Sequence, residues 1–344
     1  MQVIVPARNE EDCLGRCLKS LVSQQGIGFA VTVVDDNSTD RTNEIASSFP
    51  GVQVIRAPEP EAGISGKCNA LIAGAGRTSA KWLLFTDADT FHYPGSLASA
   101  VREAEDRGVD LLSYSPEQET GSLAEEMLLP VVFAELVRTY SPARINNPSD
   151  PAVAANGQYI LVRRTVYEEL GGHCAIEANI LEDVELARLF KESQHKIWFR
   201  HGGRLVRTRM YRNFKAMVEG WTKNLVLLFP HPRRLATLRS CEFVAILGLP
   251  VAGIILVASG GAAFGLALIA SGILLYTNFL RRIRRAHFPR RANLLSFFGL
   301  PLFVLLLARS YIHSSVRGAV QWKGREYAYS EAKSAPASSI NQTR

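Results

Sequence analysis

The first half of the chain alternates short apolar runs with amphipathic segments. Apolar runs at residues 3–5, 30–34, 52–55 and 81–85 show neither helical nor alternating spacing. This is typical of strands buried on both faces of a parallel sheet. After the first run, apolar residues recur at i, i+3, i+4, i+7 and i+8, as on one face of a helix: Leu14, Cys17, Leu18, Leu21 and Val22. The pattern predicts an α/β fold with a mainly parallel sheet flanked by helices.

Similar patterns predict the elements of the next hundred residues. They are a helix after Pro94, a strand at 110–114, a helix at 121–140, a strand at 158–163, a helix from about 181 and a strand at 196–199. The loop at 141–158 has the length of a binding-site or mobile loop. Residues 213–229 predict an amphipathic helix with Trp221 and Lys223, residue types that favour a membrane interface.

The last third of the chain is strongly apolar. No charged residue occurs from Phe243 to Leu280, and Ser259 to Gly261 lie near the middle of this stretch. About 20 apolar residues cross a bilayer, so the stretch predicts a hairpin of two transmembrane spans. A third apolar segment, 293–309, is interrupted at Gly299–Pro301 and is either a third span or a re-entrant element. We therefore predict a catalytic domain at 1–229, a membrane domain at 230–312 and a tail at 313–344 that is disordered from residue 330.

The net charge of +7 is concentrated beside the hairpin rather than in a nucleic-acid motif. Six arginines fall within residues 281–291. A basic cluster next to a span predicts a cytoplasmic anchor on anionic lipid, so we expect a multi-pass protein of the inner membrane with a cytoplasmic catalytic domain and no nucleic-acid partner. The five cysteines show no short Cys-x-x-Cys pair, which also fits a reducing compartment.

Candidate chemistry follows the apolar run at 81–85. Asp87 and Asp89 come directly after it, where ligands bind in open α/β sheets. Such a pair can hold Mg²⁺ together with substrate phosphate oxygens, although acids after strands also serve as turn formers or helix caps. Lys67 follows a glycine-containing loop and suits phosphate atoms. Glu182 and Asp183 open a predicted helix, where the helix dipole favours acids in any case.

Five motifs in order carry a family resemblance: residues 5–10 (VPARNE), 34–40 (VDDNSTD), 66–67 (GK), 87–89 (DAD) and 182–183 (ED). Over roughly residues 2–225 the chain resembles the family 2 glycosyltransferases of GT-A fold. With its membrane tail it is similar to bacterial members that glycosylate lipids, such as those associated with hopanoids or carotenoids, and more distantly to ceramide glucosyltransferase. The resemblance implies an inverting hexosyltransferase that uses a nucleotide sugar, with UDP favoured, a divalent metal (Mg²⁺ or Mn²⁺) and a lipid or lipid-linked acceptor.

The resemblance also implies roles for individual residues. Asp183 matches the general base. The donor-binding positions are Pro6, Ala7 and Glu10 beside the uridine, Asp36 at the uracil edge, Lys67 near the diphosphate sugar, and Asp87. Metal contact falls to Asp89 first and to Asp87. The Gln/Arg-x-x-Arg-Trp motif common in lipid-acceptor relatives is replaced by residues 218–224 (VEGWTKN), so Glu182, Trp221 and Lys223 are the candidates for acceptor or diphosphate contact.

Two other functions compete with this assignment. Residues 85–89 also resemble the aspartyl-phosphate motif of haloacid-dehalogenase-type phosphatases, but Phe91 stands where those enzymes need Thr or Val. A membrane-tethered module that binds a nucleotide sugar without catalysis would not need the acids, yet all are present. A Rossmann dehydrogenase is disfavoured because the first strand-to-helix turn contains no glycine.

Overall fold

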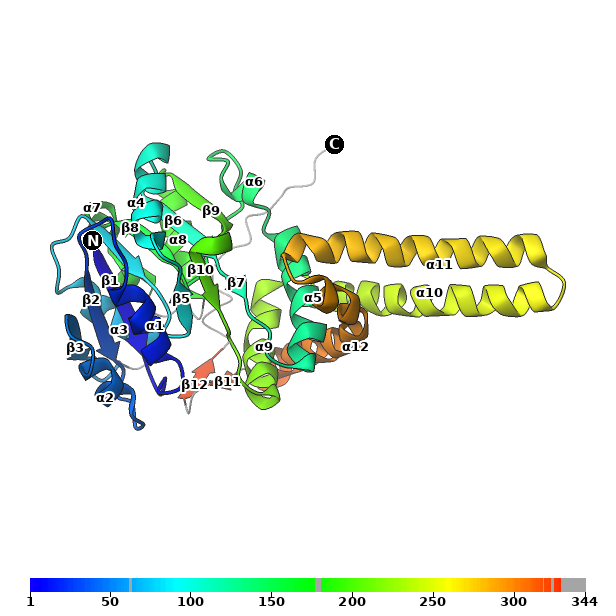
Figure 1. Ribbon diagram of the computed structural model, residues 1–344, viewed down its shortest axis with the longest axis horizontal. Helices are drawn as coiled ribbons and strands as arrows, with labels where there is room; N and C mark the ends of the chain where they lie inside the picture. The colour runs from blue at the N-terminus through cyan, green and yellow to red at the C-terminus, as the bar shows by residue number, and fades with distance from the viewer. Residues whose placement is uncertain (62–63, 177–180, 318, 323–324, 329–344) are drawn as a thin grey trace. The chain divides into compact units, whose positions relative to one another are not determined.

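A seven-stranded sheet forms the centre of the first part of the chain (Figure 1). The computed structural model describes residues 1–61, 64–176, 181–317, 319–322 and 325–328. The strands of this sheet run in the order β3-β2-β1-β4-β8-β6-β9. Among the described residues of this sheet, β8 is the one strand that is antiparallel to its neighbours. Their bounds are β1 Gln2–Ala7, β2 Ala30–Asp35, β3 Val52–Arg56, β4 Trp82–Phe85, β6 Leu111–Ser115, β8 Ile160–Arg163 and β9 Ile197–His201. The predicted GT-A-type α/β fold is confirmed.

Helices cover the sheet through two apolar cores. Side chains alternate along a strand, so Val3 packs with Leu18 of α1 in one core, whereas Ile4 packs with Leu71 of α3 in the other. The helices of this part are α1 Leu14–Val22, α2 Thr42–Ser47, α3 Gly66–Ala75, α4 Ser96–Arg107, α6 Pro142–Ile145, α7 Arg164–Glu169 and α8 Glu182–Glu192. Short 3₁₀ turns occur at η1 Gly172–Ile176 and η2 Gly203–Leu205.

A second, three-stranded sheet was not predicted from the sequence. It consists of β5 Thr90–His92, β10 Val206–Thr208 and β7 Glu117–Gln118, in the order β5-β10-β7. The strand β5 begins directly after Asp89 and pairs antiparallel with β10, with Thr90 opposite Thr208. These strands are two or three residues long, too short to show a period in the sequence. They nevertheless fix the backbone that follows the predicted metal-binding acids.

The contacts divide the chain into two compact units, and the domain boundaries given from the sequence, at residues 229 and 312, stay predictions. The first unit is Met1–Glu119 with Tyr140–Met210, and the second is Thr120–Thr139 with Tyr211–Arg344. The elements of the second unit are α5 Leu123–Thr139, α9 Phe214–Leu228, α10 Pro232–Ala258, α11 Ala262–Ile283, η3 Arg284–Ala286, α12 Arg290–Ile312, the π-helical turn η4 His313–Arg317, β11 Ala319–Trp322 and β12 Arg325–Ala328. The helix α5 belongs to this unit because its apolar residues bury against α12: a Cβ on Gly299 would meet the Met127 oxygen.

Among the residues that the structure describes, three helices of the second unit are long and apolar enough to span a membrane: α10, α11 and α12. The predicted hairpin corresponds to α10 and α11, which lie side by side in Figure 1. The predicted interruption at Gly299–Pro301 is not a break, because α12 is continuous and includes Pro301. The tail beyond residue 328, including the part predicted to be disordered, lies outside the described residues.

Candidate active site

The predicted donor-site residues lie at one edge of the central sheet. The strands β1, β2 and β4 are parallel neighbours, with Ala7 opposite Asp35 and Ile4 opposite Phe85. Their carboxyl ends therefore meet, and the segments that leave them carry Glu10, Asp36, Asp87 and Asp89. Pro6 and Ala7 are the last two residues of β1.

Lys67 joins three elements at this edge. Its Nζ lies 2.8 Å from Asp87 Oδ1 and 2.8 Å from Glu182 Oε1. The lysine sits in the first turn of α3, where the Ser65 side chain caps the helix by accepting a hydrogen bond from the Cys68 amide. Burial acts to lower the pKa of Lys67, but the two carboxylates outweigh burial and raise it well above the ordinary value. The ammonium group is therefore charged at neutral pH.

Asp89 has one carboxylate oxygen without a protein partner. Its Oδ2 lies 3.4 Å from the Gln158 amide nitrogen, whereas Oδ1 is buried and accepts no hydrogen bond from the described residues. Burial, followed by the charges of Asp87 and Glu10, raises the pKa of Asp89 to about 7. A buried carboxylate oxygen without a donor is costly unless a cation or proton binds it.

Asp183 is held by two backbone amides. Its Oδ2 accepts a hydrogen bond from Gly157 at 2.8 Å, and its Oδ1 accepts one from Val184 at 2.8 Å. Burial and then the neighbouring Glu182 charge raise the pKa of Asp183 to about 6. The carboxylate is thus fixed in orientation and titrates close to neutrality, as a general base requires.

The turn at Asn156–Gln158 was missed as part of the site. The Gly157 amide orients Asp183, and the Gln158 side chain reaches both Asp89 and the Thr208 hydroxyl, the latter at 3.1 Å. A Cβ on Gly157 would come within 2.9 Å of Lys67 Nζ. The long loop at 141–158 was predicted to serve a site, but no sequence signal showed which of its residues would do so.

Two loops form the place predicted for the nucleotide base. The loop after β1 and the loop after β2 are tied by Asn9, whose Oδ1 accepts the Thr39 amide at 2.9 Å. Arg8 donates to the Asp36 carbonyl at 3.0 Å and lies 3.7 Å from the Asp36 carboxylate. Asn9 and Asn37 take left-handed backbone angles, with φ of 54° and 56°, which Asn tolerates better than most residues. Glu10 lies four residues before α1, and its carboxylate accepts from Cys13 Sγ at 3.1 Å.

Of the three residues predicted to contact the acceptor or the diphosphate, Trp221 and Lys223 lie on α9, in the second unit, and Glu182 begins α8. Trp221 is only 2% exposed, and its ring packs edge-on against Phe133 and Tyr211 with centroids 6.2 and 6.0 Å away. This packing gives Trp221 a structural role, and ring stacking on an acceptor would require α9 and α5 to separate. The acceptor role of all three residues stays a prediction.

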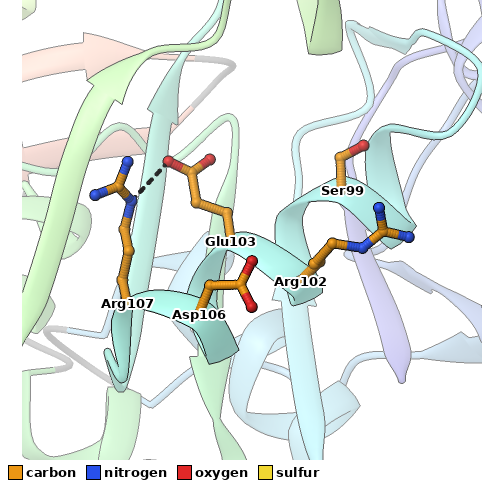
Figure 2. A pocket seen from close by; sticks show the side chains of 5 residues that line it. All are labelled: Ser99, Arg102, Glu103, Asp106 and Arg107. Atoms are coloured by element: carbon orange, nitrogen blue, oxygen red, sulfur yellow. Dashed lines mark hydrogen bonds and ion pairs between the residues drawn. The ribbon is translucent and has the colours of Figure 1, made fainter.

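The surface pocket in Figure 2 is separate from this set of residues. It is lined by Ser99, Arg102, Glu103, Asp106 and Arg107, all from α4. Glu103 and Arg107 form an ion pair one helical turn apart, at 3.0 Å. Such i, i+4 pairs are ordinary on exposed helices, so the pocket offers no competing active site.

Comparisons with known proteins agree with the arrangement at the strand ends. Residues 2–171 match the sequence model of "Glycosyl transferase family 2". This part of the chain is a domain of that family. The match includes the segments after β1, β2 and β4 and the turn at 156–158. It favours the glycosyltransferase assignment over the phosphatase alternative.

Curated relatives and a solved structure give further similarities. A 4,4'-diaponeurosporenoate glycosyltransferase of Staphylococcus haemolyticus is 32% identical over 66% of this chain, and the match spans 61% of that relative's length. The protein of the same name from Staphylococcus aureus is 27% identical over 96% of this chain and 89% of its own length. Among solved structures, the mannosyltransferase PcManGT of Pyrobaculum calidifontis superposes with a TM-score of 0.52 at 19% identity, covering 92% of this chain and 87% of that chain. The last likeness supports the fold.

Proposed function

We propose that this glycosyltransferase moves a sugar from a nucleotide sugar, with UDP as the expected nucleotide, to a lipid or lipid-linked acceptor at the cytoplasmic face of the inner membrane. The observation that carries the proposal is the cluster at the strand ends. Lys67 joins Asp87 to Glu182, and the next residue, Asp183, is fixed by the Gly157 amide. Phosphate-binding charge and a base are thus adjacent.

Asp183 supplies the base for a single inverting displacement. Each of its oxygens accepts one backbone amide and keeps a lone pair for an acceptor hydroxyl. As the hydroxyl oxygen attacks the anomeric carbon, its proton passes to Asp183, and the bond from that carbon to the diphosphate breaks. One displacement inverts the configuration at this carbon.

Lys67 and the loops after β1 and β2 bind the donor. The ammonium group of Lys67 is positioned to contact the diphosphate, because it stands beside Asp87 at the first turn of α3. Asp36 is buried at the end of β2, where its carboxylate can accept from a base N–H, with Pro6, Ala7 and Glu10 alongside. These contacts orient the donor and keep it in register with Asp183.

The acids after β4 fit a divalent cation. Asp89 offers a buried oxygen without a hydrogen-bond donor, and Asp87 lies two residues away. No group of three or more His, Cys, Asp or Glu side chains gathers as a metal site in the described residues. Mg²⁺ and Mn²⁺ bound with a nucleotide need only one or two carboxylates, since phosphate oxygens and water complete the shell. When bound there, the cation would offset the charge that develops on the leaving diphosphate.

The membrane hairpin and the relatives favour a lipid-soluble acceptor. The helices α10 and α11 are long and apolar enough to cross a membrane, and both ends of this hairpin carry arginines, including Arg239 and Arg282. Positive charge beside spans favours the cytoplasmic side, so residues before and after the hairpin would share that side. The staphylococcal relatives are named for 4,4'-diaponeurosporenoate, which makes a lipid of carotenoid type the first candidate, and the base role of Asp183 requires that the acceptor used here offer a hydroxyl group.

The test is donor binding and transfer by the full chain in nanodiscs. We expect a UDP-sugar to bind more tightly than its GDP counterpart, and we expect Mn²⁺ or Mg²⁺ to stimulate turnover. Asp183→Asn should keep donor binding and lose transfer to an added lipid acceptor. The proposal fails if no nucleotide sugar binds, with or without metal. Binding followed by transfer only to a soluble acceptor would refute its lipid part alone.

A further inference from the structure

The helices α10 and α11 contact little besides each other over most of their length. Beyond Ile246, Gly253 is the only buried residue of α10 among those described, and a Cβ on it would lie 2.6 Å from the Gly265 oxygen of α11. Large apolar side chains on both helices face outward with exposures of 37–67%: Val244, Leu247, Val251, Ile254, Ile255, Val257, Phe264, Leu266, Ile273 and Leu274. A pair of helices that exposes apolar groups on all sides is suited to lipid.

Charged side chains gather at one end of this pair, where α10 begins and α11 ends; this end is called the base of the pair. Glu242 of α10 forms hydrogen bonds with Arg282 of α11 at 2.7 and 2.8 Å and is also paired to Arg239. Glu135 of α5 is 1% exposed and lies 3.2 Å from Arg239 and 3.4 Å from Arg282. Because ionised groups are costly in hydrocarbon, this network places the membrane boundary at the base of the pair.

The third candidate span, α12, contacts the pair at that same base. Phe297 stacks on Phe243 with centroids 5.0 Å apart and meets Phe279 edge-on at 6.0 Å. Phe243 follows Glu242 directly in the sequence, and Phe279 lies three residues before Arg282. The aromatic contact is therefore at the level of the charged network, and in Figure 1 α12 lies at this end of the α10–α11 pair.

The rest of α12 packs on helices that carry charges. Its first half lies on α5, where Gly299 meets Met127 and Arg291 pairs with Glu126 at 3.1 Å. Its second half lies on α9, where the Val226 amide donates to Ser310 Oγ at 2.9 Å. The share of residues buried in its most apolar window is 44%, against 11% for α10 and 17% for α11. A spanning α12 would pull the charges of α5 and α9 into the bilayer.

The opposite side of α12 is an apolar stripe that the described residues leave uncovered. We define the stripe as the four residues Leu294, Phe298, Leu305 and Ile312, which are 54–66% exposed. At 100° per residue they fall within about 40° of one another around the helix axis. Exposed arginines stand near both ends of the stripe, at Arg290 and Arg291 and at Arg309. Apolar groups flanked by arginines match the boundary between acyl chains and anionic headgroups.

We infer that α12 is not a third span but lies in the plane of the membrane surface, with the stripe inserted among the lipids beside the α10–α11 pair. The protein then crosses the membrane twice. The occupant of the stripe is lipid because the stripe continues the lipid-facing surface of the pair through the Phe297 contact. This inference does not depend on which donor or acceptor the enzyme uses.

Depth measurements test the inference on the full chain in nanodiscs that contain anionic lipid. Cys174→Ser and Cys241→Ser remove the exposed thiols and leave three buried ones. Nitroxide labels are then placed singly on the stripe at Leu294→Cys, Leu305→Cys and Ile312→Cys. The depth of each label in the membrane is obtained by comparing its accessibility to oxygen with its accessibility to a water-soluble relaxing agent. We expect all three labels to lie at the same shallow depth. A spanning helix would separate the first and last labels by about 27 Å, at 1.5 Å per residue.

Two controls complete the test: labels on α10 that calibrate the depth scale, and epitopes at the two ends of a chain without cysteine substitutions. Val244→Cys and Ile255→Cys should differ in depth by about 16 Å, which validates the scale. An epitope after Arg344 should be accessible from the same side as one before Met1, in a chain without cysteine substitutions. Graded depths along α12, labels accessible only to water, or epitopes on opposite sides would each overturn the inference.

Discussion

Replacing Asp183 by asparagine removes the base while keeping its shape. The amide oxygen can still accept the Gly157 hydrogen bond, which keeps the turn at Asn156–Gln158 in place, and only the bond from the neighbouring Val184 amide is lost. General-base catalysis contributes roughly 10²- to 10⁴-fold to rate, which is about 3–5 kcal/mol. We therefore expect Asp183→Asn to lower kcat by that factor with an unchanged donor dissociation constant. Glu192→Gln removes a charge from the exposed far end of the same helix and should leave kcat unaltered.

The pH profile gives an independent measurement of the same role. Burial and the Glu182 charge raise the pKa of Asp183 to about 6, so the carboxylate is ionised and active above pH 6 and protonated and inactive below it. The kcat of the wild type should fall about tenfold per pH unit below this value. In Asp183→Asn, the acid limb assigned to the base should be missing from whatever activity remains.

The identity of the acceptor decides whether this reasoning holds. A hydroxyl acceptor needs a base, whereas a carboxylate acceptor is already ionised near neutral pH and can attack without one. The relatives' acceptor, 4,4'-diaponeurosporenoate, is by its name a carboxylate. A loss below tenfold in Asp183→Asn, together with no acid limb near pH 6, would refute the base assignment and point to a carboxylate acceptor. Donor binding measured alongside separates this outcome from a damaged site.

Three further substitutions test other parts of the structure. Asp89→Asn should weaken Mn²⁺ binding, as measured by titration in the presence of the nucleotide. It should also lower kcat by about a hundredfold or more, because the charge stabilisation supplied by the cation is worth several kcal/mol. An unchanged metal titration would contradict the assignment. Gly157→Ala places a Cβ 2.9 Å from Lys67 Nζ and should raise the donor KM while the thermal midpoint stays close to wild type. Gly299→Ala places a Cβ against the Met127 oxygen and should destabilise the second unit by about 1–3 kcal/mol, seen as a lower Tm in detergent, whereas Gly248→Ala meets no atom within 4 Å and should not.

The residues at the strand ends could be predicted because topology alone brings them together. Once 3–5, 30–34 and 81–85 are strands of one parallel sheet, the acids that follow them must share an edge, whatever the details of packing. The position of Glu182 in the sequence did not reveal in the same way that Lys67 is its ion-pair partner. Its link to Lys67 depends on how α3 and α8 pack, which a linear pattern does not encode.

The turn at Asn156–Gln158 and the helix α5 were beyond sequence reasoning for different physical reasons. Gly157 acts through its backbone amide, and every residue except proline has one, so no side-chain type marks it. The helix α5 was predicted as a helix, but its apolar residues could equally have packed on the sheet. Its real partner, α12, is identified by a close backbone approach at Gly299. Contacts of this kind depend on fit between distant segments, and fit has no period along a chain.

The same turn connects the two halves of the proposed chemistry. Gly157 holds the base Asp183, and the next residue, Gln158, contacts the carboxylate of Asp89 through its side chain. The Gln158 carbonyl also accepts the Thr86 hydroxyl at 2.8 Å, which ties the turn to the end of β4. A shift of this short segment would therefore move the base and disturb the metal-binding acid together.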